Sequence, residues 1–151
     1  MELARPATDA DRGPCLLLLE HALAHAVSMR GGPALVGEAT AEGLFGRWSH
    51  RKGPSRLLVG EYEGAVVGML AVAARGDGER RRGRIDCCYV EEDARGVGVG
   101  SALMEAAVGW CDEAGCAEVD ALALPGDRAT KQRLEAAGFT ARLLTLSRRL
   151  G

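Results

Sequence analysis

Residues 95–101 read Arg95-Gly96-Val97-Gly98-Val99-Gly100-Ser101, and they join an apolar run at residues 85–90 to a long helical pattern that begins near Gly98. The three glycines stand at alternate positions, so three side chains are missing where a strand passes into a helix. Backbone N–H groups are then free to point outward at the positive end of the helix dipole. Arg95 adds a full positive charge beside them. The stretch therefore predicts a phosphate-binding loop, most readily one for a pyrophosphate.

The segments on either side of this loop indicate a sheet covered by helices. Three apolar segments separated by short turns precede the loop and predict an antiparallel meander at residues 56–62, 65–74 and 84–90. Residues 98–114 carry an apolar stripe at helical spacing, which Gly115 ends. The other expected elements are a strand at residues 2–5, helices at 11–29, 40–48 and 127–136, and strands at 117–124 and 140–149. This order predicts one mixed α/β domain over residues 1–151, with a largely antiparallel sheet.

The composition excludes several classes of protein. The chain has 151 residues, 47% of them apolar, and its 19 basic and 21 acidic residues argue against a nucleic-acid binder driven by bulk charge. Its longest apolar run is too short to span a bilayer, and its five cysteines form neither a CxxC pair nor a zinc-finger pattern. We therefore expect a cytoplasmic protein with reduced thiols, no metal site, and no membrane or nucleic-acid partner.

Two familiar nucleotide-binding patterns fit the glycine loop poorly. A Walker P-loop needs a lysine after its last glycine, and the chain has no lysine between residues 53 and 130. A dinucleotide fingerprint needs a third glycine where Ser101 stands, although Glu118 and Asp120 lie about twenty residues on, where a ribose-binding carboxylate is expected. The four residues 91–94 also separate the preceding strand from the loop that begins at Arg95, and three strands of meander come before it. We therefore disfavour both patterns.

Residues 95–100, with Ala102 and Leu103, resemble the acyl-CoA loop of the GNAT superfamily of N-acetyltransferases, written (R/Q)xxGx(G/A). Residues 90–94 resemble the strand end and short link that precede this loop in the family, and residues 5–11 resemble a common opening. Residues 125–129 with 135–139 resemble the closing element, which ends in Gly-Phe. The resemblance covers essentially the whole chain. It implies the GNAT fold, in which about six to seven largely antiparallel strands, splayed at the centre, are flanked by about four helices.

The resemblance also implies a function, a co-substrate and a binding site. It implies transfer of an acetyl group from acetyl-CoA, or another acyl group from its acyl-CoA, to a primary amine of a small molecule or peptide by direct transfer. The loop amides would hold the pyrophosphate, and the splayed strand near Val90 would pair with the pantetheine arm. The residues expected to contact the co-substrate are Tyr89, Val90, Arg95, Gly96, Val97, Gly98, Val99, Gly100, Ser101, Asp127 and Lys131.

The chain departs from the family where the proton donor is expected. The usual donor is a tyrosine four residues before the glycine of the closing Gly-Phe pair, and that position is Leu134 here. The remaining candidates for acid or base are Asp86, Tyr89 and Glu91. Strand alternation places Asp86 on the same face as Cys88, as a base or as the partner of Arg84 in a salt bridge. The missing tyrosine also supports an alternative, a GNAT-fold sensor or partner-binding module that binds acyl-CoA without efficient transfer.

Other residues carry weaker signals. Cys87 and Cys88 are adjacent on the strand and are expected to pack in the core, because no basic group is evident to lower a thiol pKa. His21 and His25 lie one helical turn apart, which suits an exposed helix face or the acceptor site better than a metal without a third ligand. The acceptor itself cannot be read from the sequence. The last expected strand offers its segment at residues 143–146 for pairing across a homodimer.

Overall fold

The computed structural model describes residues 3–151 and contains a five-stranded sheet in the order β1-β2-β3-β4-β5. The strands are β1 (Ala4–Pro6), β2 (Ser55–Tyr62), β3 (Ala65–Arg75), β4 (Arg82–Val90) and β5 (Glu118–Ala121). The first four pair antiparallel with their neighbours, while β5 runs parallel to β4. The predicted meander and the mixed α/β class are therefore confirmed. Residue 2 of the first expected strand lies outside the described residues.

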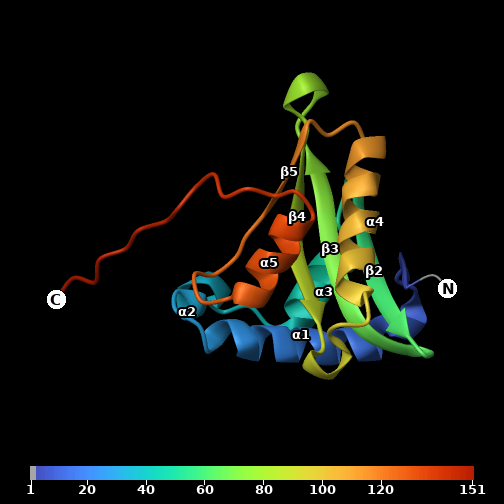
Figure 1. Cartoon of the computed structure of the whole chain (residues 1–151), viewed down its shortest axis with the longest axis horizontal. Coiled ribbons are helices and arrows are strands. Elements are labelled where there is room, and N and C mark those ends of the chain that lie inside the picture. The colour runs from blue at the N-terminus through green and yellow to red at the C-terminus, as the bar shows by residue number, and fades with distance from the viewer. Residues whose placement is uncertain (1–2) are drawn as a thin grey trace.

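The helices cover both faces of this sheet and leave two separate apolar cores (Figure 1). They are α1 (Arg12–Val27), α2 (Gly32–Val36), α3 (Ala41–Ser49), α4 (Val99–Glu113) and α5 (Arg128–Ala136). On one face, α4 contributes Leu103 and Met104 to a cluster with Leu70 and Val72 of β3. On the other face, α1 contributes Cys15 and α3 contributes Trp48 to a cluster with Val59, Met69 and Ala71. Successive side chains of β3 point to opposite faces of the sheet, so this buried strand contributes residues to both clusters.

Glycines in three neighbouring strands let α4 lie close to the sheet. A Cβ atom at Gly60 would stand 2.3 Å from Val99 Cγ1, and one at Gly83 would stand 2.4 Å from Cys111 Sγ. Gly68 is nearly as crowded, with Leu103 Cδ1 at 3.1 Å from such an atom. Because close-packed interiors cannot absorb an extra methyl group without moving their neighbours, these positions fix the height of α4 above β2, β3 and β4.

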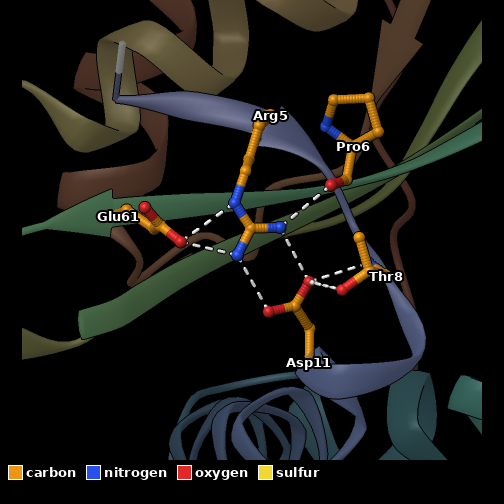
Figure 2. A network of polar contacts seen from close by, with 5 residues as sticks. All are labelled: Arg5, Pro6, Thr8, Asp11 and Glu61. Carbon is orange, nitrogen blue, oxygen red and sulfur yellow. Dashed lines mark hydrogen bonds and ion pairs between the residues drawn. The ribbon is translucent and has the colours of Figure 1, made fainter. Parts of the chain in front are cut away.

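An ion-pair network ties the start of the chain to β2 (Figure 2). The Arg5 guanidinium donates to both Asp11 carboxylate oxygens at 2.8 and 3.0 Å, and to Glu61 Oε1 at 2.6 Å. Asp11 Oδ2 also accepts the Thr8 N–H at 2.7 Å, and Asp11 is only 4% exposed. The hydrogen bonds from Arg5 hold the pKa of Asp11 down at about 2, against the opposing effect of burial.

The last part of the chain differs most from expectation. Residues 140–149, expected to form a strand, have no secondary structure and are fully exposed, so that prediction is wrong and the sheet has five strands rather than six or seven. Strand β5 is shorter than expected, and α2 was not expected at all. Helix α2 forms because Pro33 suits the first turn of a helix. None of the helices within residues 3–151 is long and apolar enough to cross a membrane.

Candidate functional site

The separation of β4 from β5 creates a cleft in which five of the expected site residues meet, namely Asp86, Tyr89, Val90, Arg95 and Asp127. The two strands pair only between Arg82–Ile85 and Glu118–Ala121, and beyond this point they diverge. The wall residues come from β4, the chain after β5, α1, α2 and α5, and they include Asp86, Cys87, Cys88, Tyr89, Val90, His25, Leu35, Leu122, Leu124, Arg133 and Leu134. Arg95 and Asp127 also line this cleft.

The glycine loop joins β4 to α4 and leaves several amides at the start of the helix without a helical acceptor. Gly96 and Gly98 have φ angles of +90° and +92°, a conformation that favours glycine, so the turn requires these two of the three alternate glycines. Ala102 N–H bonds to Gly98 O at 3.0 Å and begins the helical pattern. The N–H groups of Val99, Gly100 and Ser101 therefore lie in the first turn, where intrahelical acceptors are missing. Val99 itself is buried and fixes the loop to the core.

The open part of β4 presents backbone groups of alternate residues to the cleft. Glu91 N–H bonds to Val67 O of β3 at 2.8 Å, so alternation directs the backbone groups of Tyr89 toward β3 as well. The backbone groups of Cys88 and Val90 then face away from β3, toward the divergence. Val90 O accepts the Arg95 side-chain Nε–H at 3.3 Å, which agrees with that direction. The backbone groups of Val90, one of the residues expected to contact the co-substrate, are therefore on the open edge of β4, together with those of Cys88.

Arg133 of α5 lies in the cleft, although it was not among the residues expected at the site. Its Nη1 lies 4.0 Å from Cys88 Sγ. A Cβ atom at Gly100 would stand only 2.6 Å from Arg133 Nε, so the third glycine of the loop makes room for this side chain. The signal was present in the alternate glycines, but reading it required knowing that α5 packs against the start of α4. The cleft thus contains a second arginine besides Arg95.

Asp86 lies at a β-bulge, which changes the face that its side chain occupies. The register between β3 and β4 passes from Ala71 opposite Cys87 to Val72 opposite Ile85, so Asp86 has no partner residue. Cys88 packs with the α4 cluster, whereas the Asp86 carboxylate lies 2.9 Å from Arg51 Nη2, just after α3, and 3.4 Å from Arg84 Nε. The expectation that Asp86 and Cys88 share a face is therefore wrong. The salt bridge with Arg84, the other expected use of Asp86, is present.

Tyr89 is one of the expected acids, and Leu134 occupies the position of the usual tyrosine. Tyr89 lines the cleft, with its ring centroid 6.4 Å from that of His25. Burial, followed by the charge of Glu91, raises the pKa of the Tyr89 phenol. Leu134 is buried and also lines the cleft, so this position supplies packing and no hydroxyl.

Glu91 lies outside this cleft, in a second groove between α1 and the β2–β3 hairpin. Its carboxylate contacts His21 Nδ1 at 2.5 Å, a pair that the sequence did not indicate. His21 and His25, one turn apart, therefore border different grooves. Within residues 3–151, no cluster of three or more side chains suits a metal ion.

Asp127 and Lys131 serve α5 in different ways. Asp127 caps the helix, because its carboxylate accepts the Thr130 N–H at 3.1 Å and the Thr130 hydroxyl at 2.6 Å. Lys131 is exposed, and it is not among the residues that line the cleft.

The thiols in and near the cleft are free and held in the protonated form. Burial raises the pKa of Cys87 to about 12. Burial also raises the pKa of Cys88, although Arg133 opposes the shift. All five cysteines are free, and Cys15 and Cys111 are fully buried. These environments suit packing rather than nucleophilic attack.

Comparison with known proteins places the chain in a family. The model of the acetyltransferase (GNAT) family matches residues 28–139, which is most of the chain. The chain belongs to the GNAT family. No curated protein matches the chain. The match covers the glycine loop, α5 and the cleft wall apart from the residues of α1, such as His25.

Three solved structures illustrate this similarity of fold. A mutant of the BH1408 protein from Bacillus halodurans is 16% identical, with a TM-score of 0.82 and 98% and 99% of the two chains covered. Glucosamine-6-phosphate N-acetyltransferase from Arabidopsis thaliana is 18% identical, with a TM-score of 0.68 and coverage of 98% and 97%. Ribosomal-protein-alanine N-acetyltransferase from Brucella melitensis biovar Abortus 2308 is 19% identical, with a TM-score of 0.70 and 98% of each chain covered.

Proposed function

We propose that this GNAT protein transfers an acetyl group from acetyl-CoA to a primary amine of a small molecule or peptide. The observation that carries this proposal is the cleft between β4 and β5, which contains an open strand edge and is lined by Arg95 of the glycine loop and by Arg133, whose side chain lies against Gly100 in the first turn of α4. Five free cysteines suit a reducing compartment such as the cytoplasm.

The residues of the cleft suit the chemical parts of acetyl-CoA. The first-turn amides of α4 and the Arg95 charge suit the pyrophosphate, because both favour an anion at a helix start. The backbone groups of Cys88 and Val90 suit the amides of the pantetheine arm, which can pair with a strand edge as another strand would. Arg133 adds positive charge between these two regions.

The proposed reaction requires two proton movements. The amine nitrogen attacks the thioester carbonyl carbon, the C–N bond forms and the C–S bond breaks, so nitrogen loses a proton and the sulfur of CoA gains one. We assign Tyr89 as the donor to sulfur, since it lines the cleft and a phenol is protonated at neutral pH. Asp86 is engaged by two arginines and Glu91 by His21, so we assign the amine proton to water.

A second function, binding of acyl-CoA without efficient transfer, is favoured by Leu134 at the usual tyrosine position. Release of free thiol from acetyl-CoA over a panel of polyamines, aminoglycosides, amino acids and peptide N-termini distinguishes the two. Tight binding with no turnover on any amine would favour the sensor or partner-binding module. Loss of turnover in Tyr89→Phe, with acetyl-CoA affinity kept, would support the acid that we assign.

Calorimetric titration with acetyl-CoA tests the co-substrate. We expect Gly98→Asp to weaken binding by at least about 100-fold, because it strains a turn with positive φ and adds a negative charge beside the phosphate amides. Arg95→Ala should weaken binding by about 10-fold. Gly109→Asp, on the exposed side of α4 with open space around it, is the matched control and should bind normally. Absence of binding by the unmodified chain would refute the proposal.

A further inference from the structure

His25 lies near the end of α1 and is the polar side chain that this helix contributes to the cleft between β4 and β5. Ala22 and Ala26, on the same face of the helix, are the other wall residues from α1. The helix crosses the sheet close to the end of β4 (Figure 1), and its residues Cys15 and Leu19 are buried in the core beneath it. The imidazole is half-buried, so it is held in the cleft and still reaches solvent.

The surroundings of His25 differ from those of the other two histidines. His21 is engaged by the Glu91 carboxylate, and His50 by the carbonyl oxygen of Gly46. Within residues 3–151, by contrast, neither ring nitrogen of His25 takes part in a hydrogen bond or a salt bridge. The imidazole is therefore available to water or to a molecule in the cleft. Imidazole is also the side-chain group that most readily takes up and releases a proton near neutral pH.

The other titratable groups of the cleft are engaged or already protonated. Those that line it are Asp86, Cys87, Cys88, Tyr89, Arg95, Asp127 and Arg133, whereas α2 and residues 121–124 contribute no charged group. Arg51 and Arg84 hold Asp86, and Asp127 caps α5. Burial raises the pKa of both thiols, and arginine does not lose its proton. Among the wall residues described here, His25 is therefore the one able to accept a proton at neutral pH.

Tyr89 and His25 lie at the same point of the cleft. Their ring centroids are 6.4 Å apart and their planes are tilted by 57°, which is within the range of a direct aromatic contact. In acyl transfer, the nitrogen that loses a proton and the sulfur that gains one are bonded to the same carbon in the tetrahedral intermediate. An acid and a base that serve these two atoms must therefore lie close together. The last turn of α1, where His25 lies, is also where the helix dipole attracts a positive charge.

We propose that His25 is the base of the acetyl transfer and takes the amine proton from the water to which we assigned it, a role that rests on the proposed function. Water accepts the proton as the C–N bond forms and passes it to an imidazole nitrogen. The Tyr89 hydroxyl gives its proton to the sulfur as the C–S bond breaks. The imidazolium then returns a proton to the Tyr89 phenolate, so both side chains recover their starting forms and no proton is gained or lost overall.

The pH dependence of turnover tests this role, with an amine that the thiol-release assay identifies as an acceptor. Because the amine itself titrates, the profile is that of kcat at saturating amine. We expect His25→Gln to lower kcat by about 100-fold, the lower end of what a positioned base contributes. The acid limb of the profile, where protonation removes the base, should disappear. The affinity for acetyl-CoA, measured by calorimetry, should be kept.

His21→Gln is the matched control, because His21 lies one helical turn away and borders the other groove. It should keep both the rate and the pH profile. Added imidazole should raise the rate of His25→Ala, since the vacated site can hold the free base. In NMR spectra recorded with CoA and the amine, a pair that cannot react, the imidazole signal of His25 should shift, whereas that of His21 should not.

An acid limb that persists in His25→Gln would overturn the role of His25, and so would an NMR signal of His25 that does not move. An equal loss of rate in His21→Gln would overturn it as well, because the effect would then belong to α1 as a whole. Absence of thiol release by the unmodified chain with every amine would overturn the proposed transfer and the role of His25 with it. Release by the unmodified chain, with the same pH profile in His25→Gln, would overturn the role of His25 alone.

Discussion

The two ends of β4 differ in the strands with which they pair, although they belong to one nine-residue strand. At Arg82–Ile85 the strand pairs with β3 on one side and β5 on the other, and Arg82 bonds to Asp120 and Glu118 across the gap. At Cys88 and Val90 it pairs with β3 alone. The bulge at Asp86 lies between the two ends. The backbone edge that we propose for the pantetheine arm is therefore left open because β5 diverges from a strand that is otherwise an ordinary part of the sheet.

We call residues 82–85 of β4, which pair on both sides, its closed end, and residues 88–90, which pair with β3 alone, its open end. The largest effect is expected at the closed end, from Gly83→Val. A side chain there would meet Cys111 of α4, and the crowding should lower the free energy of unfolding by about 3 kcal/mol. Urea denaturation measures this. At the open end Gly100→Ala should cost little stability, because its neighbour is the flexible Arg133 side chain, yet it should weaken acetyl-CoA binding. Equal stability losses in the two variants would contradict the distinction between the ends.

The next largest effect is expected from the ion pair between Arg5 and Asp11. Its loss can be compared with that of the exposed pair between Arg82 and Asp120, which joins β4 to β5. Asp11→Asn should lower the free energy of unfolding by about 2 kcal/mol at neutral pH, because Asp11 is buried and bonded to Arg5 and Thr8. The pKa of Asp11 is about 2 in the folded protein and 3.8 ordinarily. Its contribution is therefore complete above about pH 4 and is lost as the pH falls toward 2. If the variant and the unmodified chain lose stability equally over that range, Asp11 is not the group responsible.

A smaller effect is expected from Arg133 at the open end. Arg133→Gln should weaken acetyl-CoA binding by about 10-fold, equivalent to about 1.4 kcal/mol, because it removes a positive charge from the cleft. Its thermal stability should remain close to that of the unmodified chain. Arg128→Gln, on an exposed position of the same helix, is the matched control for calorimetry. Unchanged affinity in Arg133→Gln would show that this side chain does not face the bound co-substrate.

The smallest effect is expected from the clamp between β4 and β5, by which we mean the salt bridge between Arg82 and Asp120. Hydrogen bonds from Arg82 lower the pKa of Asp120, but both side chains are exposed and water screens their attraction. Asp120→Asn should therefore change the free energy of unfolding by less than about 1 kcal/mol, measured by urea denaturation in low salt. A loss as large as that of Asp11→Asn would mean that the clamp, rather than the four paired residues, holds β5 in place.

The sequence predicted the parts of the site whose signals are local. The alternate glycines identified the loop at residues 95–101 because a turn with positive φ leaves its mark on neighbouring residues, and the apolar stripe of α4 followed from helical spacing. The contact between Arg133 and Cys88 joins residues 45 positions apart and could not be read from either segment. The bulge at Asp86 depends on pairing with β3, so alternation alone assigned the wrong face. The segment at residues 140–149 has the pattern of a strand, but a strand also requires a neighbour to pair with.

The weak attachment of β5 also has a consequence for motion within one copy of the protein. Strands β2, β3 and β4 follow one another through short turns and pair along most of their length. Strand β5 is held by four paired residues, and its partner strand precedes it by 36 positions along the chain. Local opening should therefore begin at β5 while the meander stays intact, and amides in β5 should exchange well before those of β3. The width of the cleft is then a fluctuating quantity, set by how often its least attached strand detaches.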